Sequence, residues 1–321
     1  MKRWLCIGLC ACLFLLSGCA SAKPLSRDTF ALDTTCSVTI YDGGDETLLD
    51  ECVRLIAARE ALWSRTKDDS DIARLNAADG APVTVDEATA SLISTAIALA
   101  GQTNGAFDVT ALALTQQWEQ AEKSGVLPRD EELAAALTAV GVQHIGVSGS
   151  TVTLRNGVTL DLGAIAKGQI GDDVAALLKE RGCTSAIIEL GGNVVAVGEK
   201  PNGDPFRVGI ADPRNPNEMI ATVAVRDCAV VTSGSYERGF TVAGKRYSHI
   251  LDPNTGKPVD NDLLSVTILC ASSTTADALS TACFVMGFDL AKALVDSLDG
   301  VEAVFVKTGG ETVATAGVTL V

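Results

Sequence analysis

"VTLDLGAIAKGQIGDDVAALLKERG", residues 158–182, joins an apolar, strand-like run to an amphipathic, helix-like run. β-Branched and apolar residues fill most of the first six positions, and apolar side chains recur at helical spacing after Gly168. The junction carries an aspartate, a lysine and two glycines between Asp161 and Gly168. The stretch therefore predicts a strand over 158–163, a helix over 168–182 and a polar turn between them.

The chain differs in texture on the two sides of this stretch. Before it, the patterns predict a strand over 29–43 and three helices, over 45–65, 84–105 and 128–141. A loop is expected over 68–76. After it, short strands alternate with Gly, Asn-Gly and Pro-rich turns, and one more helix is expected over 274–287. A helix-rich N-terminal half and a strand-rich C-terminal half predict an α+β fold in one catalytic body.

The first eighteen residues have the pattern of an export signal. A basic start precedes an apolar run from Trp4 to Leu16, and small residues follow. The closing "LSGC" predicts cleavage before Cys19 and attachment of lipid to that cysteine. A single membrane-spanning helix is the alternative, but the run is short against the roughly 20 residues that a span needs.

We therefore expect a signal peptide at 1–18, a lipidated linker at 19–28 and one domain at 29–321. The lipid would hold the protein on a membrane, facing outside the cytoplasm, at the cell surface or in the periplasm.

Composition limits the kinds of partner. The chain is 47% hydrophobic and carries a formal net charge of −15, so it can fill a core, and it repels nucleic acid. A polyanionic small ligand would need local help from a metal ion, a helix N-terminus or a few lysines. The six cysteines that follow Cys19 include no C-x-x-C pair and mostly have apolar neighbours, which favours buried thiols, although one or two disulfides are possible.

The junction at 161–168 is a candidate anion site. Backbone N–H groups at a helix start lack internal partners and suit a diphosphate, and Lys167 would add a full charge. Gly163 and Gly168 would let a ligand approach the backbone closely. The alternative is an ordinary strand-to-helix turn with Asp161 as its cap and Lys167 in solvent.

A second candidate site lies in the helix expected at 274–287. Asp277 and Thr281 are four residues apart, so both project from one helix face. A carboxylate and a hydroxyl there suit Mg²⁺, which prefers oxygen ligands. The alternative is a capping box formed by Thr274 and Asp277.

Two further segments carry possible chemistry. His249, in "YSHILDPNTGKPV", is one of two histidines and is placed to take a proton from a hydroxyl near neutral pH, although a lone histidine is more often structural. In "TNGAFDVT", Phe107 and Asp108 suit stacking of a ring and bonding of its edge, with a core aromatic and a turn carboxylate as the commoner explanation. "SGSTVT", residues 148–153, alternates like a plain hairpin strand.

Taken together, these motifs resemble the FAD:protein FMN transferases, the ApbE family of flavin-handling bacterial lipoproteins. The resemblance rests on "AFD", "DLGAIAKG", "ELGGN", "VVTSGSYERGF", "YSHILDPNTGKPV" and "TTADALSTACFVMG" in that order, and it extends from about Thr29 to the C-terminus. It implies Mg²⁺-dependent transfer of the FMN half of FAD to a Ser or Thr hydroxyl of an exported acceptor protein, with release of AMP. Subunits of membrane redox complexes are the implied acceptors.

The resemblance also implies roles for individual residues. Asp161 and Lys167 would contact FAD, and the stretch Ala106, Phe107 and Asp108 would line its flavin or adenosine site. The backbone oxygen of Ala164 would join Asp277 and Thr281 around the metal. His249 would touch FAD or assist the acceptor hydroxyl, so His249 and Asp277 are the expected catalytic residues.

Some positions depart from the family pattern, and other functions stay open. Leu32-Asp33-Thr34 stands where many members have Met-Gly-Thr, Thr66 where many have a tyrosine, and Ser235 where an aspartate is frequent. The alternatives are an FAD pyrophosphatase with water as acceptor, a non-catalytic flavin-binding lipoprotein, and self-flavinylation at Thr151.

Overall fold

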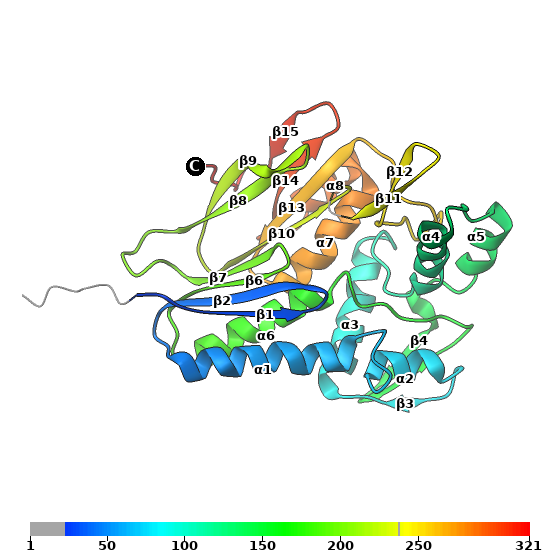
Figure 1. The fold of residues 1–321 in the computed structure, drawn as a ribbon, viewed down its shortest axis with the longest axis horizontal. Coiled ribbons are helices and arrows are strands. Elements are labelled where there is room, and N and C mark those ends of the chain that lie inside the picture. Colours follow the sequence, from blue (N-terminus) through cyan, green and yellow to red (C-terminus); the bar gives the residue numbers. More distant parts are fainter. Residues whose placement is uncertain (1–22, 237) are drawn as a thin grey trace, which may run out of the picture.

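An eight-stranded, wholly antiparallel sheet forms the centre of the computed structural model, which describes residues 23–236 and 238–321 (Figure 1). The expected signal peptide, Cys19 and the start of the linker lie outside these residues. In spatial order the strands are β1 (Leu25–Ala31), β2 (Thr34–Asp42), β6 (Ser185–Leu190), β7 (Asn193–Gly198), β10 (Cys228–Gly234), β13 (Leu263–Cys270), β14 (Glu302–Lys307) and β15 (Thr312–Ala314). The predicted α+β class is confirmed.

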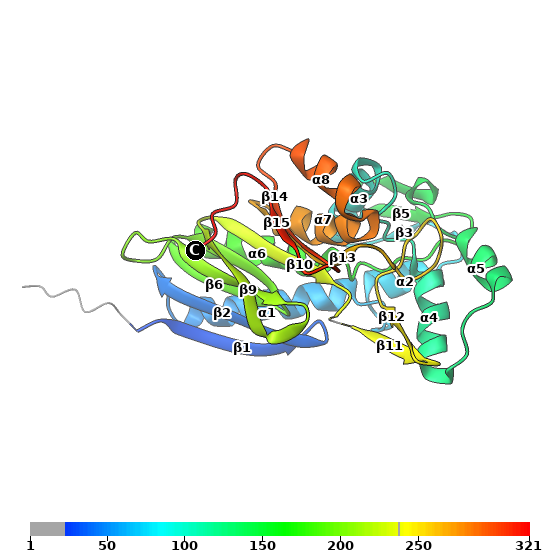
Figure 2. The same ribbon diagram turned by 90° about the horizontal axis from the view of Figure 1, so that it is seen from above.

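Helices cover one face of this sheet, and a β-hairpin packs on the other. The helices are α1 (Glu46–Trp63), α6 (Ala166–Glu180), α7 (Ser273–Met286) and α8 (Phe288–Asp296). In Figure 1 α1 and α6 lie below strands β1, β2, β6 and β7, and β8 (Phe206–Asp212) and β9 (Asn215–Val225) lie above these strands. In Figure 2 the two edge strands of the sheet, β1 and β15, lie far apart. Phe206, Val208 and Val223 form a small core under that hairpin, while the main core lies between sheet and helices.

Two smaller groups of elements complete the fold at one end of the sheet. The first comprises α2 (Asp71–Ala77), β3 (Val83–Thr84), α3 (Glu87–Gln102), η1 (Val142–His144), β4 (Ile145–Ser148) and β5 (Thr151–Leu154). The second comprises α4 (Leu112–Ser124), α5 (Asp130–Leu137), β11 (Gly239–Val242) and β12 (Lys245–Ser248). Trp118 of α4 is the centre of this second group, because its ring packs against Phe240 and Tyr247 of the β11–β12 hairpin.

Several details of the predicted secondary structure are wrong: helix α8 was not predicted, and the single strand expected at 29–43 is the hairpin of β1 and β2. The expected loop at 68–76 contains α2, which Ser70 caps and which buries Ile72 and Leu75. Helix α4 was not predicted, since no side chain caps its start at Ala111. The expected strand at 158–163 is a single bridge between Thr159 and Ala111.

The backbone of that expected strand has partners other than a sheet. Asn76 binds both the N–H and the carbonyl of Leu160, at 2.7 and 2.9 Å. Asp161 donates its N–H to the carbonyl of Val109 at 2.8 Å. These bonds satisfy the polar groups that a neighbouring strand would otherwise satisfy. The hairpin strand predicted at 148–153, in contrast, is present as β5, which pairs with β4.

All six cysteines of the described chain are free thiols, and five are buried. Burial raises the pKa of Cys52, Cys270 and Cys283 to about 12. These thiols therefore stay protonated and act as small apolar side chains. No helix within residues 23–236 or 238–321 combines the length and the apolar character needed to cross a membrane.

Candidate functional site

The start of α6 and the first turns of α7 meet at a close helix contact. Gly168 donates its N–H to Asp277 Oδ2 at 2.8 Å. Helix α6 begins at Ala166, so this N–H belongs to its first turn, where the helix itself offers no acceptor, and Asp277 satisfies it. The carbonyl of Ala164 precedes the N-cap residue Ile165 and is not one of the acceptors of the helix.

Gly168 makes this contact possible by lacking a side chain. A Cβ at this position would lie 2.7 Å from Cβ of Asp277 and would overlap the carbonyl of Ser273. The glycine therefore makes room for α7 and not for a ligand, which corrects the expectation from the sequence.

Asp277 is a buried carboxylate facing a lysine. It is 4% exposed, and Nζ of Lys167 lies 3.9 Å from its Oδ1. Lys167 also lies 3.5 Å from the carbonyl of Gly163. The capping-box alternative for Asp277 is wrong, because Ser272 caps α7 and accepts from the N–H of Thr275.

Asp172 of α6 binds the remaining N–H groups at the start of α7. It accepts from the backbone of Ser273 and Thr274 at 2.7 and 2.9 Å, and from the hydroxyl of Ser272 at 2.9 Å. With the helix start satisfied in this way, the carboxylate of Asp277 remains directed at α6.

A chain of hydroxyl groups orients Thr281. Ser280 donates to the carbonyl of Asp277 at 2.9 Å, so it must accept from Ser233, whose Oγ lies 2.8 Å away. Ser233 has one proton, so at 3.3 Å it accepts from Thr281. The lone pairs of the Thr281 hydroxyl are then free for a cation.

These oxygens fit a hard divalent cation. Mg²⁺ in proteins usually takes one or two carboxylates and completes its shell with water and substrate phosphates. Asp277, Thr281 and the Ala164 carbonyl supply one carboxylate and two neutral oxygens. The described residues contain no group of three or more His, Cys, Asp or Glu side chains that could hold a metal, so a site of this kind would depend on phosphate oxygens as well.

Asp161 lies at the other end of the same turn, and its carboxylate has protein partners. Oδ1 accepts from the N–H of Gly163 at 2.8 Å, and Oδ2 lies 3.1 Å from Nε of Arg65. Arg65 also binds Glu119 of α4. Burial would lower the pKa of Arg65, but the hydrogen bond that Arg65 donates to Glu119 and the charges of Asp161, Glu119 and Asp33 outweigh it and raise the pKa.

The stretch Ala106 to Asp108 lies beside this turn through the bond between Val109 and Asp161. Its side chains fit the alternative explanation, a core aromatic residue and a turn carboxylate. Phe107 is 1% exposed and belongs to the core, so the expectation that its ring stacks on a ligand is wrong. Asp108 accepts from the N–H and the hydroxyl of Thr110, at 2.8 and 2.6 Å.

His249 is exposed, and its ring has one hydrogen bond to the part of the chain that the structure describes. Its Nδ1 lies 3.1 Å from the carbonyl of Arg238. A carbonyl only accepts, so this bond assigns the proton to Nδ1 and leaves a lone pair on Nε2. Desolvation is the main cause that lowers the pKa of His249, and the charges of Arg238, Lys167 and Arg246 lower it further, against the opposing effect of the Arg238 hydrogen bond. A neutral imidazole with a free Nε2 can accept a proton.

The fold therefore brings together most of the residues singled out in the sequence. Asp161, Ala164, Lys167, Asp277 and Thr281 surround the contact of α6 with α7, and His249 lies within electrostatic reach of Lys167. Sequence reasoning missed Arg65 and the function of Ser233, although Ser233 belongs to the motif "VVTSGSYERGF" that it singled out.

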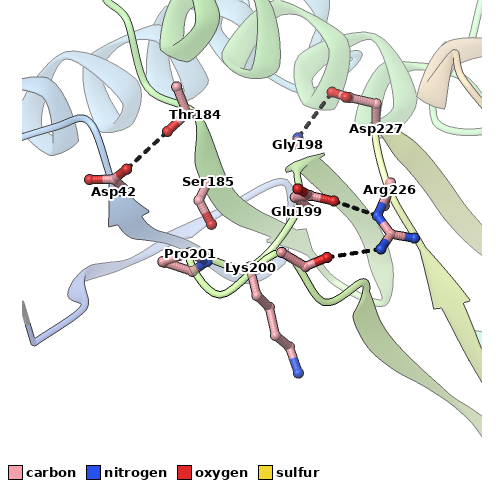
Figure 3. Close-up of a pocket in the computed structure, with 10 residues that line it drawn as sticks. Asp42, Thr184, Ser185, Gly198, Glu199, Lys200, Pro201, Arg226 and Asp227 are labelled. Carbon is pink, nitrogen blue, oxygen red and sulfur yellow. Dashed lines mark hydrogen bonds and ion pairs between the residues drawn. The ribbon is translucent and has the colours of Figure 1, made fainter. Parts of the chain in front are cut away.

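Two cavities lie at different distances from the contact of α6 with α7. The larger, of about 530 Å³, lies at the far end of α6 and contains none of the predicted site residues (Figure 3). Some of its polar groups pair with one another: Arg226 with Glu199 at 2.5 Å, and Thr184 with Asp42 at 3.2 Å. The smaller, of about 400 Å³, is lined in part by Ser248, the residue before His249.

Comparison with known proteins points to one family. A family model described as "ApbE family" matches residues 32–305. The chain is 38% identical to the FAD:protein FMN transferase of Treponema pallidum, over 97% of this chain and 93% of that protein. It is 33% identical to the FAD:protein FMN transferase of Vibrio cholerae, over 92% of this chain and 91% of that one.

Solved structures agree with this result. The crystal structure of the ApbE protein from Thermotoga maritima superposes with a TM-score of 0.85 at 34% identity, covering 92% of this chain and 97% of that one. The flavin transferase ApbE from Vibrio cholerae gives 0.82 at 30% identity, covering 92% and 97%.

Proposed function

The chain belongs to the ApbE family, and we propose that, as an FAD:protein FMN transferase, it moves the FMN moiety of FAD onto a Thr or Ser hydroxyl of an exported acceptor protein. The acceptor oxygen attacks the phosphorus of the FMN half. The bond between the two phosphates breaks, a phosphoester forms, and AMP leaves with the bridging oxygen. The acceptor class is that of FMN-carrying subunits of membrane redox complexes.

One observation supports this site above all others. A buried carboxylate, an ammonium group and the start of a helix converge where α6 meets α7, with Gly168 N at 2.8 Å and Lys167 Nζ at 3.9 Å from Asp277. Attack on a diphosphate builds negative charge on phosphoryl oxygens, in a protein that is itself strongly acidic. Positive charge must therefore be concentrated where α6 meets α7.

Asp277, Thr281 and the carbonyl of Ala164 would hold Mg²⁺. The ion supplies charge neutralisation at the diphosphate when it is bound. Lys167 adds a positive charge from the protein and orients the phosphates, and Asp161 and Asp108 line the nucleotide. His249 receives the proton of the acceptor hydroxyl at Nε2, which its lowered pKa keeps unprotonated at neutral pH.

The transfer is tested by incubating the purified protein with FAD, Mg²⁺ and an FMN-accepting domain. A covalent fluorescent adduct and an equal amount of AMP are expected. Asp277→Asn should reduce the rate by about 10²–10³, because one electrostatic partner at such a site typically contributes about 3–4 kcal/mol. Asp289→Asn, on the exposed face of α8, is the matched control and should leave the rate unchanged.

Other outcomes identify the alternatives. FMN and AMP released without any acceptor would identify a pyrophosphatase, and retained FAD without turnover at saturating Mg²⁺ would identify a carrier. Modification of the enzyme itself at Thr151 would appear as a mass increase after exposure to FAD. That hydroxyl belongs to the central strand of the small β3-β5-β4 sheet.

We further propose that the protein is a lipoprotein, tethered to a membrane through Cys19 with its domain outside the cytoplasm. The support is the sequence pattern of residues 1–28. An exported position agrees with an acceptor that is itself exported.

A further inference from the structure

The smaller cavity, of about 400 Å³, adjoins the contact of α6 with α7, where transfer would occur. It lies between the β11–β12 hairpin and the β13–α7 side of the main sheet, and we call it the hairpin cavity. Phe284 in its wall is three residues beyond Thr281 on α7, which is about 4.5 Å along the helix axis. Ser235, also in the wall, is two residues beyond Ser233, which binds Thr281. The cavity therefore begins about one helical turn from the predicted metal ligand Thr281.

The lining of the hairpin cavity is basic, unlike the protein as a whole. Its described lining residues include three cations, Lys245, Arg246 and Lys257, against one carboxylate, Asp260. The chain carries a net charge of −15. A local excess of positive charge in an acidic protein attracts anionic groups to this place.

The cations of the cavity can change partners at little cost. Lys245 pairs with Asp260 at 3.2 Å and Lys257 with Asp130 at 3.0 Å, and all four side chains are more than half exposed. Ion pairs of this kind contribute little stability. Arg246 donates to the carbonyls of Ser235 and Tyr236, at 3.2 and 3.3 Å, and forms no ion pair with a carboxylate of the described chain.

The cavity also offers apolar surface beside its charges. Tyr247 and Trp118 contribute to the lining, and their rings pack 5.6 Å apart. Lys245 lies over the ring of Tyr247 at 5.6 Å. Aromatic faces with flanking cations can hold an extended peptide through its side chains and its acidic groups together.

We propose that the hairpin cavity docks an acidic segment of the acceptor protein, next to the Ser or Thr that receives FMN. This inference rests on the proposed function, because it assigns a binding surface to the second substrate of the same reaction. The diphosphate of FAD is assigned to Lys167 and the start of α6, so the second substrate must enter from another side. The hairpin cavity supplies that side, and its charge selects an anionic segment.

The test measures the two substrates separately. The probes are an acceptor domain that the wild-type enzyme modifies and a variant of it in which the acidic residues flanking the modified hydroxyl are replaced by amides. The double variant Lys245→Gln/Lys257→Gln should raise the KM of the unmodified acceptor about three- to tenfold, as expected for the loss of two charge contacts. The KM of FAD and kcat should not change.

Three controls separate docking from general loss of charge. Lys179→Gln/Lys292→Gln removes two lysines whose ion pairs, elsewhere on the surface, are about half exposed, and it should leave both KM values unchanged. The amide variant of the acceptor should bind the wild-type enzyme more weakly and should lose its sensitivity to Lys245→Gln/Lys257→Gln. Arg246→Lys, which keeps the charge, should retain most of the affinity.

The outcomes distinguish this proposal from the proposed function. Transfer with an unchanged acceptor KM in the double variant overturns the docking proposal and leaves the transferase intact. A rise in the KM of FAD alone assigns the cavity to the nucleotide and also overturns it. Lysine-dependent binding of an FMN-accepting domain, measured by calorimetry without FAD, supports docking even if the enzyme does not modify that domain, in which case the proposed function fails by itself.

Discussion

Ser233 illustrates how one uncharged side chain would control the proposed metal ligand Thr281. Its hydroxyl accepts a hydrogen bond from Thr281 and donates one to Ser280. It therefore fixes the direction in which the lone pairs of Thr281 point. Partners that orient a metal ligand typically contribute 10- to 100-fold in metal affinity.

Ser233→Ala should therefore weaken Mg²⁺ binding by about 10- to 100-fold. The measurement is the Mg²⁺ concentration needed for half-maximal transfer, together with the thermal stabilisation by Mg²⁺ and FAD. Thr232→Val is the matched control, because it removes a hydroxyl one residue earlier on β10, where Thr232 bonds to Thr267 at 2.8 Å. Equal Mg²⁺ dependence in both variants would contradict the assignment.

His249 sets the expected pH dependence. Its pKa is lowered from 6.5, so the neutral form is present at neutral pH, and activity should fall only as the pH drops through a value below 6.5. The same group contributes to stability in full above about pH 6.5 and loses that contribution as the pH falls through its folded-state pKa. A profile of kcat/KM against pH checks this, and His249→Gln should remove the acid limb. An inflection above 6.5 would refute the role.

At the scale of elements, the close contact of α6 and α7 makes a sharp prediction at Gly168. A Cβ there would press on Asp277 and on the backbone of Ser273, so Gly168→Ala should cost about 1–3 kcal/mol of stability through overpacking and displace the carboxylate. Thermal unfolding and transfer activity measure the two effects.

Gly101→Ala provides the control for that experiment. Gly101 also lies in a helix, α3, but a Cβ there would meet nothing within 4 Å. Alanine is the better helix former by about 0.8–1 kcal/mol, so this variant should be neutral or stabilising. Comparable destabilisation by the two substitutions would show that packing against α7 is not what requires glycine at 168.

The elements also show what sequence patterns can and cannot predict. Periodicity predicted α6 and α7 because each has an apolar face over more than three turns. Helix α2 was missed because it spans only seven residues, and the strand at 158–163 was wrongly expected because Asn76, over eighty residues away, supplies its backbone partners.

The same limit holds for the candidate site. The motifs named Lys167 and Asp277, but they are 110 positions apart, and no spacing rule brings them to 3.9 Å. Family resemblance carried that information. Arg65 was missed because its importance lies in joining Asp161 to Glu119, and neither partner is near it in sequence.

At the scale of the whole molecule, the N-terminal hairpin orients the site relative to the proposed lipid anchor. Strand β1 starts at Leu25, beside Ile40, and its seven residues extend about 20 Å to the turn at Leu32 and Asp33 (Figure 1). Leu32 binds Glu60 at 3.0 Å, and Asp33 acts on Arg65, the partner of Asp161. The chain thus enters the domain at the end of the hairpin opposite to the candidate site.

This arrangement predicts that the anchor and the chemistry are separable. Cys19→Ser should move the protein from the membrane fraction to the soluble fraction, because one cysteine carries the lipid in the proposed lipoprotein. Its kcat/KM toward a soluble acceptor domain should stay within about twofold of wild type, since the site lies about 20 Å from the entry point of the chain. Transfer to a membrane-embedded acceptor should fall, because tethering raises the effective concentration of the two proteins. Mass spectrometry of the N-terminal peptide checks the lipid directly, and a Cys19→Ser protein that remains on membranes would show that another segment anchors it.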